Sequence, residues 1–189
     1  MTENSVKQRE LEAGASIEEE ELYSGRIFQL KRETLQIGSA PPHIWDLIRH
    51  PGATAVLPIQ NNGNVVLLKQ WRRAINKIIY EIVAGLLEEG EDPKAGSLRE
   101  MQEEAGYKAG RLTPLGGLYS APGFCNEYIH LFLGTELEKS SLPQDLHEGI
   151  DVVEMPLDDA LSLIDQGEIN DAKTICALLR YQRILSQNA

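Results

Sequence analysis

Three glutamates in the middle of the chain have the residue type and spacing to bind a divalent cation. On a helix, Glu100 and Glu104 lie four residues apart on one face, and Glu103 is adjacent to Glu104. Three carboxylates this close repel one another when unpaired, and Mg²⁺ binds carboxylate and phosphate oxygens, with Mn²⁺ as the alternative ion. Arg99, four residues before Glu103, can bridge to that carboxylate and orient it. The group therefore indicates a magnesium site; the alternative is an ordinary solvated acidic helix face.

The helix that must carry these side chains has clear ends in the sequence. Asp92 is a suitable N-cap, Pro93 suits the first helical position, and Gly106 is the usual left-handed terminator. The face opposite the glutamates is apolar and can anchor the helix in a core. That face carries Ala95, Leu98, Met101 and Ala105.

Apolar runs predict strands around this helix and two more helices near the C-terminus. A β-hairpin is expected from residues 53–59 and 65–68, because these two runs flank the turn Asn61-Asn62-Gly63-Asn64. Further strands are expected at residues 78–83, 115–119, 128–133 and 152–155, and helices at 157–166 and 171–186. Interleaved strands and helices predict an α/β fold with a mixed sheet sandwiched between helices.

The composition of the 189-residue chain limits its functions. A formal net charge of −11 argues against a nucleic-acid-binding protein, although a polyanionic substrate can still bind where metal ions supply positive charge. No apolar run approaches the roughly 18 residues of a membrane helix, and the polar start is not a secretion signal. Cys125 and Cys176 lack neighbours at zinc-site spacing and are expected to be ordinary thiols of a cytoplasmic protein.

The stretch from residue 85 to 107 resembles the Nudix box. Seven fully specified positions at this spacing would arise by chance with a probability on the order of 10⁻⁸ per start site. Tyr107 stands where an aliphatic residue is commoner, which we interpret as a packing variation. The positions that match are Gly85, Glu91, Arg99, Glu100, Met101, Glu103, Glu104 and Gly106.

The resemblance implies a Nudix-type α/β/α sandwich with a mixed sheet and an N-terminal β extension. We expect a flexible acidic arm at residues 1–20, because the run Glu18 to Glu21 follows a segment without apolar periodicity. Residues 21–50 would form the β extension, which in the resembling enzymes makes a swapped dimer, and residues 51–189 the hydrolase domain. A homodimer is therefore expected from the resemblance.

Several neighbours of the box resemble the ADP-ribose pyrophosphatase branch of that family. Pro122 follows Tyr107 by fifteen residues, although Pro122-Gly123 is also a common turn pair. Arg72, Glu81 and Glu127 also look like that branch, whereas Val83 departs from it, since proline is usual before Ala-Gly. The nearest rival substrates are GDP-mannose and a broad set of nucleotide sugars. A rival of another class is a non-catalytic nucleotide-sensing module, which would be expected to have lost the ligand carboxylates.

The resemblance also implies roles for individual residues. The metal ligands would be Glu100, Glu103, Glu104 and the backbone carbonyl of Ala84. Glu148 would deprotonate or position the attacking water, with Glu103 as the second catalytic candidate. Arg72 would contact phosphate or ribose, and Glu81 would bind a sugar hydroxyl or orient Arg72. Pro122, Glu127, Phe28 and Trp45 complete the candidate substrate site, the last two by stacking on the base. Gly85, Glu91, Arg99 and Gly106 would have structural roles.

Overall fold

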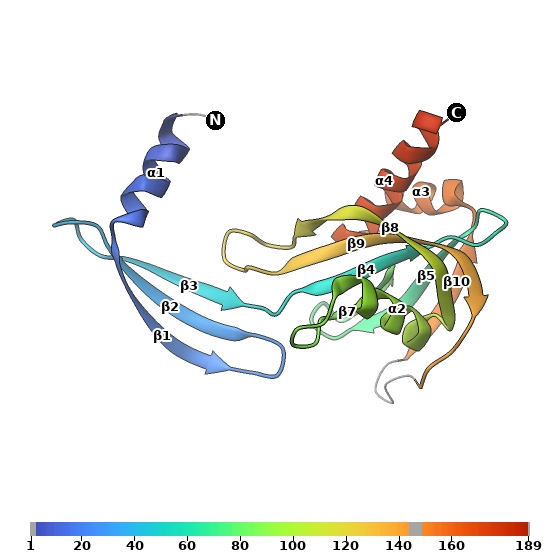
Figure 1. Cartoon of the computed structure of the whole chain (residues 1–189), viewed down its shortest axis with the longest axis horizontal. Helices are drawn as coiled ribbons and strands as arrows, with labels where there is room; N and C mark the ends of the chain where they lie inside the picture. Colours follow the sequence, from blue (N-terminus) through green and yellow to red (C-terminus); the bar gives the residue numbers. More distant parts are fainter. Residues whose placement is uncertain (1–2, 144–148, 189) are drawn as a thin grey trace. The chain divides into compact units, whose positions relative to one another are not determined.

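A computed structural model describes residues 3–143 and 149–188 and divides the chain into two compact units (Figure 1). The smaller unit comprises the chain up to Pro51 together with Ala121–Glu127, and the larger unit comprises Gly52–Ser120 and the chain from Tyr128 onward. The segment Ala121–Glu127 therefore belongs with the N-terminal extension, not with the domain around it in the sequence.

The larger unit contains two sheets that together mix parallel and antiparallel pairs. The four-stranded sheet has the order β7-β4-β9-β8, in which β4 and β9 are parallel and the other pairs antiparallel. The three-stranded sheet has the antiparallel order β10-β5-β6. The strands are β4 (Ala53–Pro58), β5 (Val65–Arg72), β6 (Lys77–Glu81), β7 (Val83–Leu86), β8 (Tyr107–Tyr119), β9 (Tyr128–Lys139) and β10 (Ile150–Met155). The predicted mixed sheet is thus confirmed.

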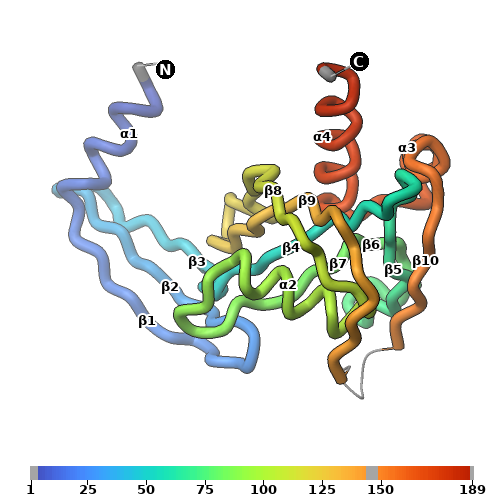
Figure 2. Tube along the Cα trace, turned by 45° about the vertical axis from the view of Figure 1, so that its right-hand side comes forward, coloured from blue at the N-terminus to red at the C-terminus, as the bar shows by residue number. Residues whose placement is uncertain are grey.

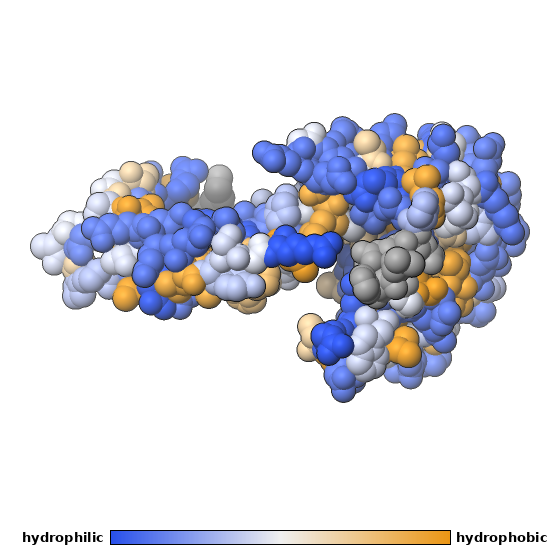
Figure 3. Space-filling view, turned by 90° about the horizontal axis from the view of Figure 1, so that it is seen from below, coloured by the Kyte–Doolittle hydropathy of each residue, from blue (hydrophilic) through white to orange (hydrophobic). Residues whose placement is uncertain are grey.

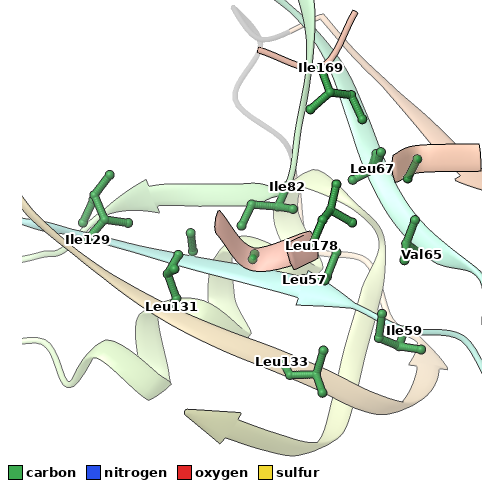
Figure 4. Close-up of a cluster of buried hydrophobic side chains, with 14 residues drawn as sticks. Leu57, Ile59, Val65, Leu67, Ile82, Ile129, Leu131, Leu133, Ile169 and Leu178 are labelled. Atoms are coloured by element: carbon green, nitrogen blue, oxygen red, sulfur yellow. The ribbon is translucent and has the colours of Figure 1, made fainter. Parts of the chain in front are cut away.

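Helices cover both faces of these strands, as the alternation of side chains along β4 shows. Leu57 packs in one core with Leu178 of α4 (Ala172–Asn188), and α3 (Leu157–Asp165) adds to that core (Figure 4). Val56, on the opposite face of β4, packs in a second core with Met101 of α2 (Pro93–Glu104). Successive strand residues point to opposite faces, so β4 has a helix layer on each side. The tube in Figure 2 shows α2 beside β7 and β4, and the α/β/α sandwich is confirmed.

The smaller unit is a three-stranded antiparallel sheet preceded by a helix. The helix is α1 (Glu3–Ala13), and the sheet has the order β1-β2-β3, from β1 (Ser16–Ser24), β2 (Gln29–Gln36) and β3 (His43–Arg49). Ile48 joins the segment Ala121–Glu127 to this sheet, because its N–H donates to Phe124 O at 2.7 Å.

The acidic run at residues 18–21 lies in β1, whereas the sequence predicted a flexible arm over residues 1–20. Residues 3–13 are helical and 16–24 form a strand. The like charges are offset by cations on the neighbouring strands, since Lys31 Nζ lies 3.3 Å from Glu19 and 3.1 Å from Glu21. Ion pairs between strands therefore offset the repulsion among adjacent glutamates that the local sequence indicated.

Two sequence predictions about strand pairing were wrong. The turn at residues 61–64 forms, with Gly63 at a φ of +87°, but its flanking strands belong to different sheets and share only the bridge between Ile59 and Val65. The strand expected at residues 78–83 is likewise divided between β6 and β7, which lie in separate sheets. β4 pairs with β7 and β9, which lie much farther along the sequence and which local patterns do not reveal, whereas β5 pairs with the nearby β6 and with β10.

No helix in the described part of the chain is long and apolar enough to cross a membrane. Cys125 and Cys176 are both free thiols.

Candidate active site around the α2 helix

The helix α2 begins and ends as its sequence predicts. Asp92 Oδ1 accepts hydrogen bonds from the N–H groups of Lys94 at 2.8 Å and Ala95 at 3.1 Å, which are otherwise unpaired in a first turn. Pro93 occupies the first turn, and Gly106 follows the helix with a φ of +70°. Only glycine adopts this left-handed conformation without strain, which stops the helix directly after the glutamates.

Contacts on its inner face fix α2 against β4. Met101 is fully buried, and Leu98 packs against the same core, whereas Ala95, expected on that face, is exposed. Ser97 is also buried, and its hydroxyl bonds to the hydroxyl of Thr54 on β4. The apolar and polar anchors together hold the helix in one rotation about its axis.

Arg99 connects the loop before α2 to the glutamates on it. Its Nε and Nη2 donate to the two oxygens of Glu91 at 3.0 Å each, and Nη1 donates to Glu100 Oε1 at 2.7 Å and Glu103 Oε2 at 3.0 Å. The predicted bridge from Arg99 to Glu103 is present. The Arg99 hydrogen bond lowers the pKa of Glu91, although partial burial opposes this. Hydrogen bonds and charges of Glu91 and then Glu100 raise the pKa of Arg99 against its own partial burial.

The other end of the acidic face lies against β7. Glu104 is 5% exposed, and its Oε2 accepts a hydrogen bond from the Ala84 N–H at 3.0 Å. The Glu100 carboxylate approaches Gly85 so closely that a Cβ atom there would lie 1.9 Å from Glu100 Oε1. Gly85 is therefore required by the close approach of a carboxylate to the backbone. The structure brings Ala84, Gly85 and these two glutamates together.

The donors fit a divalent cation in chemical type. Carboxylate oxygens are the ligands that Mg²⁺ prefers, and one cationic group, Arg99 Nη1, already lies between Glu100 and Glu103. Within residues 3–143 and 149–188, no three His, Cys, Asp or Glu side chains converge as a preformed metal-binding group. A bound ion would compete with the Arg99 guanidinium for the two glutamates.

A second charged group joins β5 to β6. Arg72 donates to both oxygens of Glu81, from Nε at 2.6 Å and from Nη2 at 3.1 Å. Burial disfavours the charge of Arg72, but the hydrogen bonds and charge of Glu81, with the charges of Glu104 and Asp171, outweigh it and raise its pKa. Of the two roles considered for Glu81, the geometry favours orienting Arg72 over binding a sugar hydroxyl directly.

Lys173 is a member of this group that the sequence analysis missed. Its ammonium lies 2.5 Å from Glu81 Oε1 and 3.1 Å from Asp171 Oδ1, and the residue is 9% exposed. One signal in the sequence could have found it. A lysine in the first turn of a helix is placed against the helix dipole, so a nearby carboxylate partner is to be expected.

The remaining candidates lie in the smaller unit or outside the described residues. Phe28 and Trp45 are 38% and 43% exposed. Gln29, next to Phe28, and Glu33, which pairs with Trp45, are separated along the backbone by four strand residues, or about 13 Å. Glu127 lies 3.6 Å from His50 Nε2, and Pro122 lies in the segment that joins β3. Glu148 lies outside the described residues.

Comparisons with known proteins show the family to which this chain belongs. The family model described as "NUDIX domain" matches residues 48–178. An ADP-ribose pyrophosphatase of Bacillus subtilis (strain 168) is 39% identical over 167 residues, covering 86% of this chain and 89% of that protein. A methanol dehydrogenase activator of Bacillus methanolicus is 37% identical, with coverage of 86% and 89%. A GDP-mannose pyrophosphatase of Yersinia pestis (strain Pestoides F) is 32% identical, with coverage of 87% and 89%.

A solved structure agrees with the fold. The crystal structure described as "ADP compounds hydrolase" superposes with a TM-score of 0.81 at 22% identity, covering 93% of this chain and 96% of that one. At this identity the likeness shows the fold alone. The family match over most of the chain and the relatives above 30% identity lead to one conclusion: the chain belongs to the Nudix family of hydrolases, which typically depend on a divalent metal.

Proposed function

We propose that the protein hydrolyses the diphosphate of ADP-ribose and related nucleoside diphosphate sugars with Mg²⁺, giving a nucleoside monophosphate and a sugar phosphate. The observation that carries the proposal is the acidic face of α2, where Glu100 and Glu103 share one cationic group and Glu104 contacts Ala84 on β7. A site of this kind suits an anionic substrate in a chain with a net charge of −11, because the metal supplies local positive charge.

The residues that would hold the ion are Glu100, Glu103, Glu104 and the backbone carbonyl of Ala84, with Mn²⁺ as the alternative ion. The chemistry that the ion supplies when bound is charge neutralisation at the diphosphate and activation of water for attack. Arg99 keeps Glu100 and Glu103 in position through its two bonds to Glu91. Gly85 leaves the space that the Glu100 carboxylate needs.

The substrate would be held on the side of Arg72. A guanidinium oriented by a buried carboxylate presents its remaining N–H groups in a fixed direction, which suits a phosphate or ribose oxygen. In the proposal, Glu81 orients Arg72, and Pro122 and Glu127 line the sugar or base. Phe28 and Trp45 stack on the base, and their separation along the sheet is compatible with roles in different protomers.

The proton of the attacking water would be taken by Glu148 or, failing that, by Glu103. One carboxylate oxygen of Glu103 is already engaged by Arg99, so Glu148 is the better candidate for the base. Gly149 follows Glu148 directly, has open space on its Cβ side and can adopt many backbone conformations, which suits a catalytic loop.

The substrate assignment is tested by specificity constants over a panel of nucleotides. ADP-ribose should be among the best substrates, and the main competitors should be GDP-mannose and other nucleotide sugars, because relatives are named as ADP-ribose and GDP-mannose pyrophosphatases. If only nucleoside triphosphates or dinucleoside polyphosphates are hydrolysed, the substrate assignment fails. Tight binding of ADP-ribose without turnover would instead favour the non-catalytic nucleotide-sensing module, although this chain keeps its ligand carboxylates.

A homodimer through the smaller unit, in a cytoplasmic protein, completes the proposal. By register, Ile17 opposite Leu35 and Trp45 opposite Glu33 lie on one face of the sheet, and Ile17 and Trp45 are 55% and 43% exposed. Figure 3 shows apolar side chains at the surface of this unit among hydrophilic ones. In sedimentation experiments, Ile17→Asp should yield monomers and the control Leu185→Asp should not. A monomeric wild-type protein at micromolar concentration would contradict the proposal.

A further inference from the structure

Lys173 is a buried cation to which the proposed mechanism gives no role. It lies in the first turn of α4, with its ammonium 2.5 Å from Glu81 and 3.1 Å from Asp171. Glu81 and Lys173 are 92 residues apart in the sequence, so the fold brings them together. A lysine is rarely buried unless its charge is paired, and pairing here is with two carboxylates.

Glu81 is the residue that connects Lys173 to Arg72. It is 3% exposed, and its Oε1 accepts from both Lys173 Nζ and Arg72 Nη2, while Oε2 accepts from Arg72 Nε. Within the described part of the chain, each hydrogen bond to the Glu81 carboxylate comes from one of these two cations. Removal of Lys173 would leave Arg72 as its sole partner among the described residues, in a buried place where a charge needs full pairing.

Lys173 also balances the charge of the group. Arg72 and Lys173 offset Glu81 and Asp171, so the four side chains together are neutral. Without Lys173 they would carry a net charge of −1 beside Arg72, whose side chain is 40% exposed, and this would repel a diphosphate. Asp171 itself is held in the first turn of α4, because its Oδ2 accepts from the Thr174 N–H at 3.0 Å and from the Thr174 hydroxyl at 2.6 Å.

The same turn of α4 also holds the backbone beside Glu81. Thr174 is fully buried, and its Oγ1 accepts a hydrogen bond from the Ile82 N–H at 2.9 Å. From one helical turn, Lys173 thus binds the Glu81 side chain and Thr174 binds the backbone amide of Ile82. The end of β6 is thereby fixed relative to α4, which limits the positions that Arg72 can take.

We propose that Lys173 is a positioning residue of the substrate site: it holds Glu81 in place, so that Glu81 presents Arg72 to the anionic substrate without excess negative charge. This inference rests on the proposed function, because it assumes that Arg72 contacts the substrate diphosphate or ribose. Lys173 itself contacts no substrate and acts through Glu81.

The test is the steady-state kinetics of Lys173→Met with ADP-ribose and Mg²⁺. Because the loss concerns binding of substrate and not the bond-breaking step, KM should rise about tenfold or more while kcat changes less than about threefold. Lys173→Arg keeps the charge and should bring KM back to within about threefold of wild type. The matched control Lys108→Met removes an exposed lysine of β8 and should leave KM unchanged.

A second pair of variants separates positioning through Glu81 from a general effect on folding. In a Glu81→Gln background, Lys173→Met no longer leaves a buried Glu81 carboxylate short of a cation, so the double variant should fold even where the single one does not. The double variant should change KM less than about threefold relative to Glu81→Gln alone, because the Glu81 carboxylate through which Lys173 acts is already absent. An effect of Lys173→Met that is equally large in both backgrounds overturns the proposal.

The outcomes distinguish this inference from the proposed function. A wild-type protein that hydrolyses none of the nucleotide sugars overturns both. An active wild type together with a folded Lys173→Met protein of normal KM overturns the positioning role alone.

Discussion

Arg99 and Glu91 form a two-point ion pair, in which Nε and Nη2 of the guanidinium each lie 3.0 Å from a different oxygen of the carboxylate. The third nitrogen of Arg99 is thereby directed at Glu100 and Glu103. The pair joins the loop before α2 to the helix itself. Glu91 and Arg99 thus have a structural role at this spacing, although neither is a proposed metal ligand.

The stability that this pair contributes should depend on pH. The Arg99 hydrogen bond lowers the pKa of Glu91 below 4.5, so its contribution is complete above the unfolded value and is lost as pH falls through the lower folded value. Glu91→Gln should cost on the order of 1 kcal/mol of unfolding free energy at pH 7. Urea denaturation at a series of pH values checks this. A difference from wild type that persists unchanged well below pH 4.5 would be inconsistent with the pair.

Glu104→Gln should separate the effect of the Glu104 charge from the effect of its hydrogen bond with Ala84. The Gln side chain keeps an oxygen that can accept from the Ala84 N–H, so the melting temperature should change little. The loss of a ligand charge where the diphosphate charge must be offset should lower kcat on the order of 10²-fold or more. The matched control is Glu138→Gln, an exposed glutamate on β9, which should retain full activity. Near-normal turnover of the Glu104 variant would remove it from the proposed metal ligands.

Gly85→Ala should displace a proposed metal ligand without removing any functional group. The new Cβ would lie 1.9 Å from Glu100 Oε1, so the carboxylate or the strand must move. A ligand displaced by about 1 Å is expected to cost about 10²-fold in rate. Gly14→Ala is the control, because the nearest atom to its new Cβ would be 3.9 Å away. Unchanged rate and metal dependence in Gly85→Ala would show that Glu100 is not needed in its present position.

Glu148→Gln should lower kcat strongly while leaving substrate affinity nearly unchanged. A group that acts mainly in the transition state contributes little to ground-state binding, and loss of a general base is typically worth about 10²- to 10⁴-fold in rate. Comparison of kcat and KM with those of Glu103→Gln tests the assignment. A Glu148 variant with near-normal kcat would transfer the role to Glu103.

Features that local signals determine could be predicted from the sequence. Asp92, Pro93 and Gly106 marked the ends of α2, and Leu98, Met101 and Ala105 indicated its buried face, although Ala95 is exposed. The bridge from Arg99 to Glu103 followed from helical spacing alone. The spacing of the acidic residues was sufficient to recognise the family and, with it, the sandwich fold.

Features that depend on distant partners could not be predicted in this way. The β4 and β5 strands flank a well-formed turn but pair with other strands, because β4 is buried between β7 and β9. The acidic β1 strand is ordered by cations of β2 and β3, which its own sequence does not reveal. Lys173 reaches Glu81 only because α4 packs against the larger unit's strands.

Product analysis of ADP-ribose incubated with the purified protein directly tests whether the chain hydrolyses the diphosphate at a metal site. With Mg²⁺ we expect stoichiometric AMP and ribose 5-phosphate, no turnover in excess EDTA, and recovery of activity when Mg²⁺ is restored. Full turnover in excess EDTA would contradict the metal site on α2. Products other than a nucleoside monophosphate and a sugar phosphate would contradict cleavage of the diphosphate.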